Sequence, residues 1–476
     1  MSRYGRFNRH SFSISRRRFL GGAVAAAAGM AAGCAGKQAA TVGNETAATG
    51  ETITVVQPHV LGGAGKVPPS ERLNVASIGG GGKAAGDITS FANENCNIVA
   101  ICDVDWLNAA PMFMAYPKAN RYRDFREMLT KEEKNIDAVI VTIPDHMHAP
   151  AAIMAMKMGK HCYCQKPLTH TVYEARLMAR VAKETGVATQ MGNEGQADES
   201  IRAVAEYIAA GAIGKVREVH NWCDRPRGGC PWPQAIERPK EAMKVPPSLS
   251  WDLFLGVAPE RPYHSAYHPF RWRGWYDFGT GALGDIGCHT FHPIFKILNL
   301  TYPISVEPFT TELHAETYPL VSMIRYEFPA RSENYPAVTL TWYDGMLTPP
   351  RPPELEKDRS MGSGGTMYVG DKGKILHNRI IPESKHREFP KPPETLPRSI
   401  GHFKEFIQAC KGGPPAGSNF EFAAMVTEAV LLGNVALRVQ RKIEWDHVSG
   451  KVTNVPEANQ YLTKEYRKGW EDLVVV

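Results

Sequence analysis

Four consecutive glycines directly after a short apolar run constrain this chain more than any other feature. The run is 73–78, and Gly79, Gly80, Gly81 and Gly82 follow it, ahead of a helix start of small residues at Ala84. Gly79, Gly81 and Ala84 match the G-x-G-x-x-G/A fingerprint of a dinucleotide-binding βαβ unit. A flexible glycine loop is the alternative. The position after an apolar strand favours a tight turn that presents backbone N–H groups and a helix N-terminus to a pyrophosphate.

Strands and helices alternate from 71 to 194, which predicts a parallel sheet with helical crossovers. The expected strands are 73–78, 98–102, 136–142, 161–164 and 187–191, and polar clusters follow several of them. Ligands of such sheets bind at the carboxyl ends of the strands. Asp103 follows Gly81 by 22 residues (103 − 81), where a carboxylate accepts hydrogen bonds from the adenosine ribose. An acid there favours NAD over NADP, because it would repel a 2′-phosphate.

The N-terminus predicts export. Arg16 and Arg17 precede Phe19-Leu20 and a weakly apolar run, 21–32, as in a twin-arginine signal peptide. We therefore expect residues 1–34 to direct the folded protein, with its cofactor trapped, through the twin-arginine machinery to the periplasm. Lipidation of Cys34 and plain cleavage nearby both remain open. Residues 35–70, rich in Ala, Gly, Thr and Pro, predict a linker.

The remainder, 195–476, has a different pattern. Half-buried strands with apolar residues at every second position, such as 338–342, stand among segments with helical spacing. The predicted fold class is α/β, with an N-terminal Rossmann domain (71–194) and a C-terminal α+β domain (195–476) that carries a mainly antiparallel open sheet. The net charge of +6 comes largely from the first eighteen residues, so we expect no nucleic-acid partner.

Four motifs in this order resemble the Gfo/Idh/MocA oxidoreductase family over roughly 73–440. They are the glycine turn 78–82, the loop 144–148 (Pro-Asp-His-Met-His), Lys166-Pro167, and Asp285-x-x-x-His289. The resemblance implies a Rossmann domain and an α/β domain whose open sheet covers the active site and supports a homo-oligomer, a dimer or a tetramer. It also implies a carbohydrate substrate and a tightly bound nicotinamide cofactor, NAD rather than NADP.

The resemblance also assigns site residues. Lys166 would hydrogen-bond the reacting hydroxyl, His289 would take its proton, and Asp285 would orient the His289 imidazole. The alternatives are a surface charge for Lys166, a buried core position for His289 and a helix N-cap for Asp285. No metal is expected, because matching ligands for the loop histidines are lacking in the sequence. The residues expected to bind the cofactor are Gly79, Gly80, Gly81, Gly82, Lys83, Asp103, Pro144, His146, His148, Gln165, Lys166 and Asn193.

Three positions depart from the family pattern. Gln165 stands where relatives carry Glu, and His292 stands where many carry Asp. A Pro- and Trp-rich insert, 225–247, resembles only a subset of exported relatives. Trp272, Trp275 and Tyr276 either stack on a sugar ring or pack in the core.

The sequence thus predicts an NAD(P)-dependent oxidoreductase that transfers hydride between a sugar, glycoside or polyol and its nicotinamide. One alternative is an NAD-dependent glycosidase that uses transient oxidation, elimination, hydration and re-reduction. A second is a non-catalytic sugar-binding relative, against which the presence of Lys166, Asp285 and His289 argues.

Overall fold

The computed structural model of the chain describes residues 71–229 and 231–473. The predicted export signal (1–34), its Cys34 and the linker (35–70) lie outside these residues and remain predictions.

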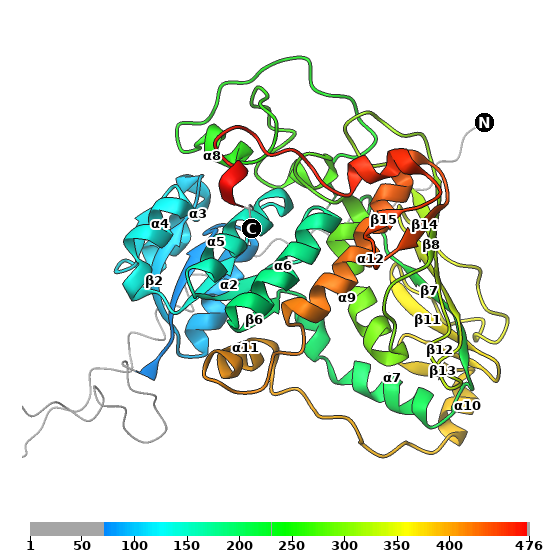
Figure 1. Cartoon of the computed structure of the whole chain (residues 1–476). Helices are drawn as coiled ribbons and strands as arrows, with labels where there is room; N and C mark the ends of the chain where they lie inside the picture. The colour runs from blue at the N-terminus through cyan, green and yellow to red at the C-terminus, as the bar shows by residue number, and fades with distance from the viewer. Residues whose placement is uncertain (1–70, 230, 474–476) are drawn as a thin grey trace, which may run out of the picture. The chain divides into compact units, whose positions relative to one another are not determined.

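The first sheet has six parallel strands in the order β3-β2-β1-β4-β5-β6 (Figure 1). This is the doubly wound order in which the strand order reverses beside β1, and nucleotides bind at that crevice. The apolar run in β4 is explained by its position, since Val139, Ile140 and Val141 are fully buried between helices on both faces. The strands are β1 (Asn74–Ile78), β2 (Asn97–Cys102), β3 (Asn120–Tyr122), β4 (Ala138–Val141), β5 (His161–Cys164) and β6 (Thr189–Met191).

Helices from both ends of the chain cover this sheet. Phe406 of α11, about 240 residues beyond β5, packs edge-on against Phe91 and Tyr163, with ring centroids 5.8 and 5.9 Å away. The C-terminal part of the chain therefore completes the core of the first domain. The helices between or after these strands are α2 (Lys83–Asn93), α3 (Trp106–Ala115), α4 (Phe125–Lys131), α5 (His148–Lys157) and α6 (Val172–Thr185), and α11 spans His402–Cys410.

The second sheet has nine strands in the order β13-β12-β11-β7-β10-β9-β8-β14-β15. Its pairs are antiparallel except β7 with β10, which confirms the predicted mainly antiparallel sheet. The strands are β7 (Val216–Trp222), β8 (Ser305–Thr310), β9 (Ser322–Phe328), β10 (Val338–Tyr343), β11 (Gly365–Gly370), β12 (Lys374–Leu376), β13 (Arg379–Ile381), β14 (Ile443–Asp446) and β15 (Lys451–Val452).

Two long helices, α9 (Gly281–Leu298) and α12 (Phe420–Val439), pack against one face of this sheet (Figure 1). Phe291 of α9 lies edge-on to Tyr326 of β9 at 5.4 Å. In length and composition α12 could cross a membrane, but most of it is buried inside the protein, where it packs against α6 and α9. Its apolar character therefore serves the core.

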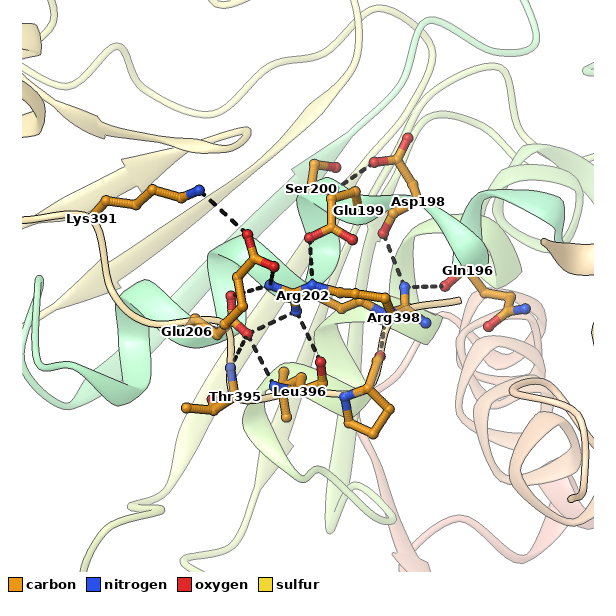
Figure 2. A network of polar contacts seen from close by, with 12 residues as sticks. Gln196, Asp198, Glu199, Ser200, Arg202, Glu206, Lys391, Thr395, Leu396 and Arg398 are labelled. Atoms are coloured by element: carbon orange, nitrogen blue, oxygen red, sulfur yellow. Dashed lines mark hydrogen bonds and ion pairs between the residues drawn. The ribbon is translucent and has the colours of Figure 1, made fainter. Parts of the chain in front are cut away.

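The chain between α10 (Glu383–Glu388) and α11 is irregular and is held on α7 (Glu199–Ala209) by polar contacts (Figure 2). Glu206 accepts hydrogen bonds from the backbone N–H groups of Thr395 (2.8 Å) and Leu396 (3.1 Å) and from the Arg398 guanidinium (2.8 and 2.9 Å). These contacts fix the path of the chain before α11. The remaining short helices are α8 (Trp251–Leu255), η2 (Glu133–Asn135), η3 (Asp145–Met147), η4 (Glu194–Ala197), η5 (Arg271–Gly274), η6 (Pro456–Tyr461) and η7 (Glu471–Leu473).

Candidate active site

A cavity of about 680 Å³ lies at the carboxyl ends of β1, β2, β4 and β5 and reaches the first turns of α9. The glycine turn and Asp103 line one part of it, and Lys166, Asp285 and His289 line another. The structure therefore brings the nucleotide fingerprint and the three predicted catalytic residues into one space.

The glycine turn packs so closely against its neighbours that larger residues would clash at two of its positions. Gly79 has φ +105°, and a Cβ atom there would lie 2.1 Å from the carbonyl oxygen of Thr142. A Cβ on Gly81 would lie 2.1 Å from the side chain of Asn108, a cavity residue that the sequence analysis missed. Ala84 is fully buried behind the turn. The turn can thus bring backbone close to a phosphate, as the fingerprint requires.

Asp103 follows β2 and lines the cavity as predicted. Its Oδ2 accepts hydrogen bonds from the N–H groups of Gly80 (2.8 Å) and Gly81 (3.2 Å), and its Oδ1 accepts one from Asp105 (2.8 Å). Burial raises the pKa of this carboxyl, and the backbone donors oppose that rise. Asp103 therefore ties the end of β2 to the glycine turn.

Lys83 and Gln165 meet at a buried acid, Asp87 of α2. Lys83 pairs with Asp87 at 2.7 Å, and the Gln165 amide donates to the same carboxylate at 3.0 Å. Burial raises the pKa of Asp87, and Lys83 opposes the rise. Lys83, Gln165 and Pro144 also line the cavity, as expected for cofactor contacts.

The reactive end of the cavity contains a compact ionic cluster. Lys166 donates from Nζ to the Asp285 carboxylate (2.8 Å) and to the Asp285 carbonyl (2.7 Å), and Arg273 donates from Nε to the same carboxylate (3.2 Å). Burial disfavours the charged form of Asp285, but Lys166 and Arg273 outweigh burial and hold its pKa well below the usual value.

This cluster corrects the predicted role of Asp285. Among the described residues, its carboxylate bonds Lys166 and Arg273, and it makes no hydrogen bond with His289. Two adjacent cations attract the carboxylate more strongly than a neutral imidazole does. Asp285 therefore positions Lys166, and His289 lies one helical turn further along α9 without that support.

Two groups beside the cluster can exchange a proton. Burial, assisted by the charge of Lys166, lowers the pKa of His289 to about 3, so the ring is neutral at pH 7. Burial raises the pKa of Asp145 to about 7, although its Oδ2 accepts a 2.6 Å hydrogen bond from Thr280. The sequence analysis missed Asp145, because it weighed the histidines of the 144–148 loop and could not foresee this burial.

Four predicted cofactor residues lie outside the cavity lining: Gly80, whose N–H donates to Asp103, and His146, His148 and Asn193. The His146 ring is buried against the Phe254 carbonyl (3.0 Å), and the two His148 ring nitrogens lie 2.8 Å from the carbonyls of Pro167 and Ile143. Asn193 is buried, with a 3.5 Å contact to the carbonyl of Cys288. These side chains hold loops together, while Asp145, just before His146, and Met147, between the two histidines, line the cavity.

The opposite wall comes from the irregular segment 223–280. It is rich in aromatic and basic side chains, and Trp272 is the one predicted stacking residue that lines this cavity; Trp275 is fully buried in the core, and Tyr276 lines a different cavity. The other members of this wall are Arg225, Trp232, Leu253, Phe254, His268, Pro269, Phe270 and Arg273.

Polar contacts attach this segment to the first domain. Arg123 donates to the Ser248 carbonyl (2.8 Å), Ser250 N–H donates to the Val104 carbonyl (2.8 Å), and His268 pairs with Asp105 (2.9 Å). These contacts lie beside Asp103, so the segment covers the end of the cavity where the adenosine ribose is expected.

Comparison with known proteins agrees with this arrangement. A family model described as an oxidoreductase family with an NAD-binding Rossmann fold matches residues 73–193, and the model for the C-terminal alpha/beta domain of the same family matches 232–333. The chain belongs to the Gfo/Idh/MocA oxidoreductase family. The predicted fold and the predicted NAD cofactor are thereby confirmed. The Gfo/Idh/MocA domain order also accounts for the cavity, which both domains line.

Individual relatives cover only part of this Gfo/Idh/MocA chain. A levoglucosan dehydrogenase of Pseudarthrobacter phenanthrenivorans is 27% identical over 36% of the chain and 34% of its own length. A glycosyl hydrolase family 109 protein of Shewanella pealeana is 30% identical over 36% of the chain and 38% of its own length. The chain thus spans little more than a third of these curated relatives. The WlbA dehydrogenase of Bordetella pertussis, solved with NADH and UDP-GlcNAcA, shares the fold with a TM-score of 0.55 at 16% identity, over 79% of this chain and 99% of its own.

Proposed function

We propose that the protein is an NAD-dependent oxidoreductase that removes hydride from a hydroxyl-bearing carbon of a sugar, glycoside or polyol, or returns it. The observation that carries the proposal is the single cavity in which the Lys166–Asp285–Arg273 cluster lies beside the glycine turn and Asp103. The family match supports the cofactor, and the dehydrogenase among the curated relatives supports the carbohydrate class.

The cavity residues fit NAD. The glycine turn, in which a Cβ on Gly79 or Gly81 would clash with a neighbour, suits a pyrophosphate, and Asp103 stands where a ribose acid is needed. When bound, the nicotinamide supplies the acceptor for a hydride. Asp103 favours NAD over NADP, because a 2′-phosphate would face a carboxylate there.

The protein must handle the hydroxyl proton that leaves when hydride leaves the carbon. Lys166, held by Asp285, can hydrogen-bond the substrate oxygen and stabilise its ionised form. His289 is neutral at pH 7 and so is available as the acceptor, although its pKa of about 3 makes it a weak base. Asp145 is a second acceptor, since a group with a pKa of about 7 is well matched to proton transfer near neutral pH.

Substitutions test these roles. Lys166→Ala and His289→Ala should each lower turnover by roughly 10²-fold or more with nucleotide still bound. Their effects should be far from additive if both groups serve one proton transfer. Asp285→Asn should cost less, since Lys166 remains.

Turnover, bound nucleotide and thermal unfolding are measured together on each variant. A stable, nucleotide-bearing His289→Ala with near-normal turnover would remove His289 from the mechanism. In that case Asp145→Asn, an isosteric change, should lower turnover instead, and it should abolish the pH dependence of turnover near 7. A variant that loses stability and nucleotide in step with activity would indicate a structural role instead.

The glycosyl hydrolase among the relatives favours a second candidate function. In that chemistry a sugar is oxidised, the aglycone is eliminated, water is added and the ring is reduced again, so the bound NAD returns to its starting state. Release of nitrophenol from a nitrophenyl glycoside with no added cofactor would support it. Oxidation of the sugar that leaves the bound nucleotide reduced, with no release of nitrophenol, would support the dehydrogenase.

We also propose that the protein is exported by the twin-arginine route and forms a dimer or a tetramer. Arg16 and Arg17 support the first proposal, and the open second sheet supports the other. Changing both arginines to lysine should leave the precursor in the cytoplasm. Normal export of that variant, or a monomer by light scattering, would contradict the respective proposal.

A further inference from the structure

A second cavity, of about 340 Å³, lies apart from the active-site cavity. It is lined by α12, by the start of α6 and by the chain around 257–259 and 461–465. Pro259, Thr463 and Glu465 are exposed at its rim. Its volume lies within the range of small-molecule sites. The active-site cavity shares no lining residue with it.

The cavity contains an arginine without a protein acceptor. The Arg438 guanidinium stacks between the rings of Tyr276 (4.4 Å) and Tyr461 (4.1 Å). Within the residues that the structure describes, the Arg438 guanidinium makes no hydrogen bond or ion pair with a protein group. Stacking holds the planar group in place and leaves its N–H edges free, the arrangement that recognises a carboxylate bidentately.

The other charges of the cavity are already paired. Lys464 donates to Glu174 (3.1 Å), to the His146 carbonyl (3.1 Å) and to His170 (3.0 Å). Asp277 pairs with Arg261, outside the lining. Among the described residues that line this cavity, Arg438 is thus the one cation left for a ligand, and Glu465 at the rim disfavours a dianion. A singly charged anion therefore matches the charges of this cavity better than a phosphate ester does.

Polar groups around Arg438 suit a ligand that carries hydroxyls. Asn434 is 6% exposed, and its Oδ1 is buried without a partner, so it lacks a donor that a hydroxyl would supply. Tyr276 and Thr171, which both carry hydroxyls, line the same space. We infer that this cavity is a second binding site, for a small monocarboxylate bearing several hydroxyl groups, the chemistry of a sugar acid.

The site is connected to the active site by hydrogen bonds. Asn434 donates to the Thr280 carbonyl (2.9 Å), and the Thr280 hydroxyl donates to Asp145 (2.6 Å). Lys464 bonds the carbonyl of His146, the residue after Asp145. A ligand that hydrogen-bonds to Asn434 is therefore linked through Thr280 to Asp145, without entering the active-site cavity.

Calorimetric titration of the purified protein with glucuronate, and with glucose as the neutral match, tests the inference. Glucuronate should bind at one site per chain and glucose should not. Arg438→Gln should weaken binding by about 10-fold or more, since a hydrogen-bonded charge contributes about 1.5–3 kcal/mol. Arg441→Gln is the matched control, because Arg441 lies just beyond α12, is exposed and pairs with Glu457 at 2.7 Å. Arg273→Gln controls for binding in the active-site cavity.

A second measurement keeps the test valid if Arg438→Gln does not fold. In the wild-type protein, glucuronate and not glucose should slow the modification of Arg438 by phenylglyoxal several-fold, as mapped by mass spectrometry. Saturable binding that depends on Arg438 and survives Arg273→Gln, together with this protection, supports the second site. Failure of glucuronate to bind, loss of binding in Arg273→Gln but not in Arg438→Gln, or unprotected Arg438 would overturn it.

Discussion

The wall of the active-site cavity that faces the nucleotide is made of strand ends from one parallel sheet, whereas the opposite wall is the irregular segment 223–280. Strand register fixes the first wall, so the glycine turn, Asp103 and Lys166 are placed by backbone pairing. The second wall is held by separate polar contacts such as Asp105–His268. The difference suggests that the first wall determines whether nucleotide binds, and that the second determines how firmly it is enclosed.

A substitution in the glycine turn should have the largest effect. Gly79→Ala places a Cβ atom 2.1 Å from the Thr142 oxygen and forces a non-glycine residue to φ +105°, a strain of about 1–3 kcal/mol before the clash is counted. The purified variant should retain less than about a tenth of the wild-type nucleotide. The measurement is nucleotide content after denaturation.

Gly86→Ala is the matched control for that change. It lies in α2, about one helical turn beyond the same loop, and nothing stands within 4 Å of its added Cβ. Alanine favours a helix, so stability should stay level or rise slightly. A Gly79→Ala protein with full nucleotide content would contradict the view that this wall depends on close backbone approach.

Cutting a contact of the second wall should have a smaller, kinetic effect. His268→Ala removes the partner of Asp105 beside the ribose end of the cavity. Nucleotide should remain bound but should exchange with labelled NAD about 10-fold faster, as expected for loss of one charge-assisted hydrogen bond.

His314→Ala is the control for His268, because His314 pairs with Glu237 of the same segment (2.8 Å) without reaching the first domain. Its exchange rate should match the wild type. Equal rates in all three proteins would mean that segment 223–280 does not enclose the nucleotide.

A contact far from both walls should change stability alone. The Arg398 guanidinium and two backbone N–H groups lower the pKa of Glu206 to about 2 (Figure 2). The pKa of Glu206 is lower in the folded protein than its ordinary value of about 4.5. Its ionised carboxylate therefore contributes fully to the free energy of unfolding above pH 4.5, and this contribution is lost as the pH falls toward 2. Glu206→Gln should lower the melting temperature at pH 7 by a few degrees, with a smaller difference near pH 3.

Lys391→Gln provides the comparison for Glu206. Lys391 is exposed and lies 3.4 Å from Glu394, a pair of the kind that contributes little. Its melting temperature should be unchanged, and neither variant should alter nucleotide exchange. Faster exchange in Glu206→Gln would show that the 391–398 segment influences the cavity.

Regular elements with a strong apolar signal could be predicted from the sequence. The expected strand 161–164 is β5, residue for residue, and the expected strand 338–342 is β10, which extends one residue further. The short strand β3 was missed, because Asn120, Arg121 and Tyr122 are polar and partly exposed at the edge of the sheet. The parallel pairing of β7 with β10 also could not be foreseen, since alternation indicates which face is buried but not strand direction.

The site divides in the same way. Motif order predicts Lys166, Asp285 and His289, and the three residues do lie together in the cavity. One of the two partners of the Asp285 carboxylate, however, is Arg273, which comes from segment 223–280. The raised pKa of Asp145 depends on burial, which the Thr280 hydrogen bond only partly opposes, and this burial exists only in the folded chain. Side-chain partners drawn from irregular segments are therefore what sequence reasoning misses.

The central claim is that one cavity holds NAD and passes it a hydride from a carbohydrate carbon. The most direct test incubates the purified protein, with no cofactor added, with sugars and polyols deuterated at their hydroxyl-bearing carbons, then denatures it and analyses the released nucleotide by mass spectrometry. We predict NAD from the untreated protein, and a nicotinamide that gains deuterium after incubation with a substrate. Release of NADP, release of no nicotinamide nucleotide, or NAD that never acquires deuterium from any of these compounds would contradict the account.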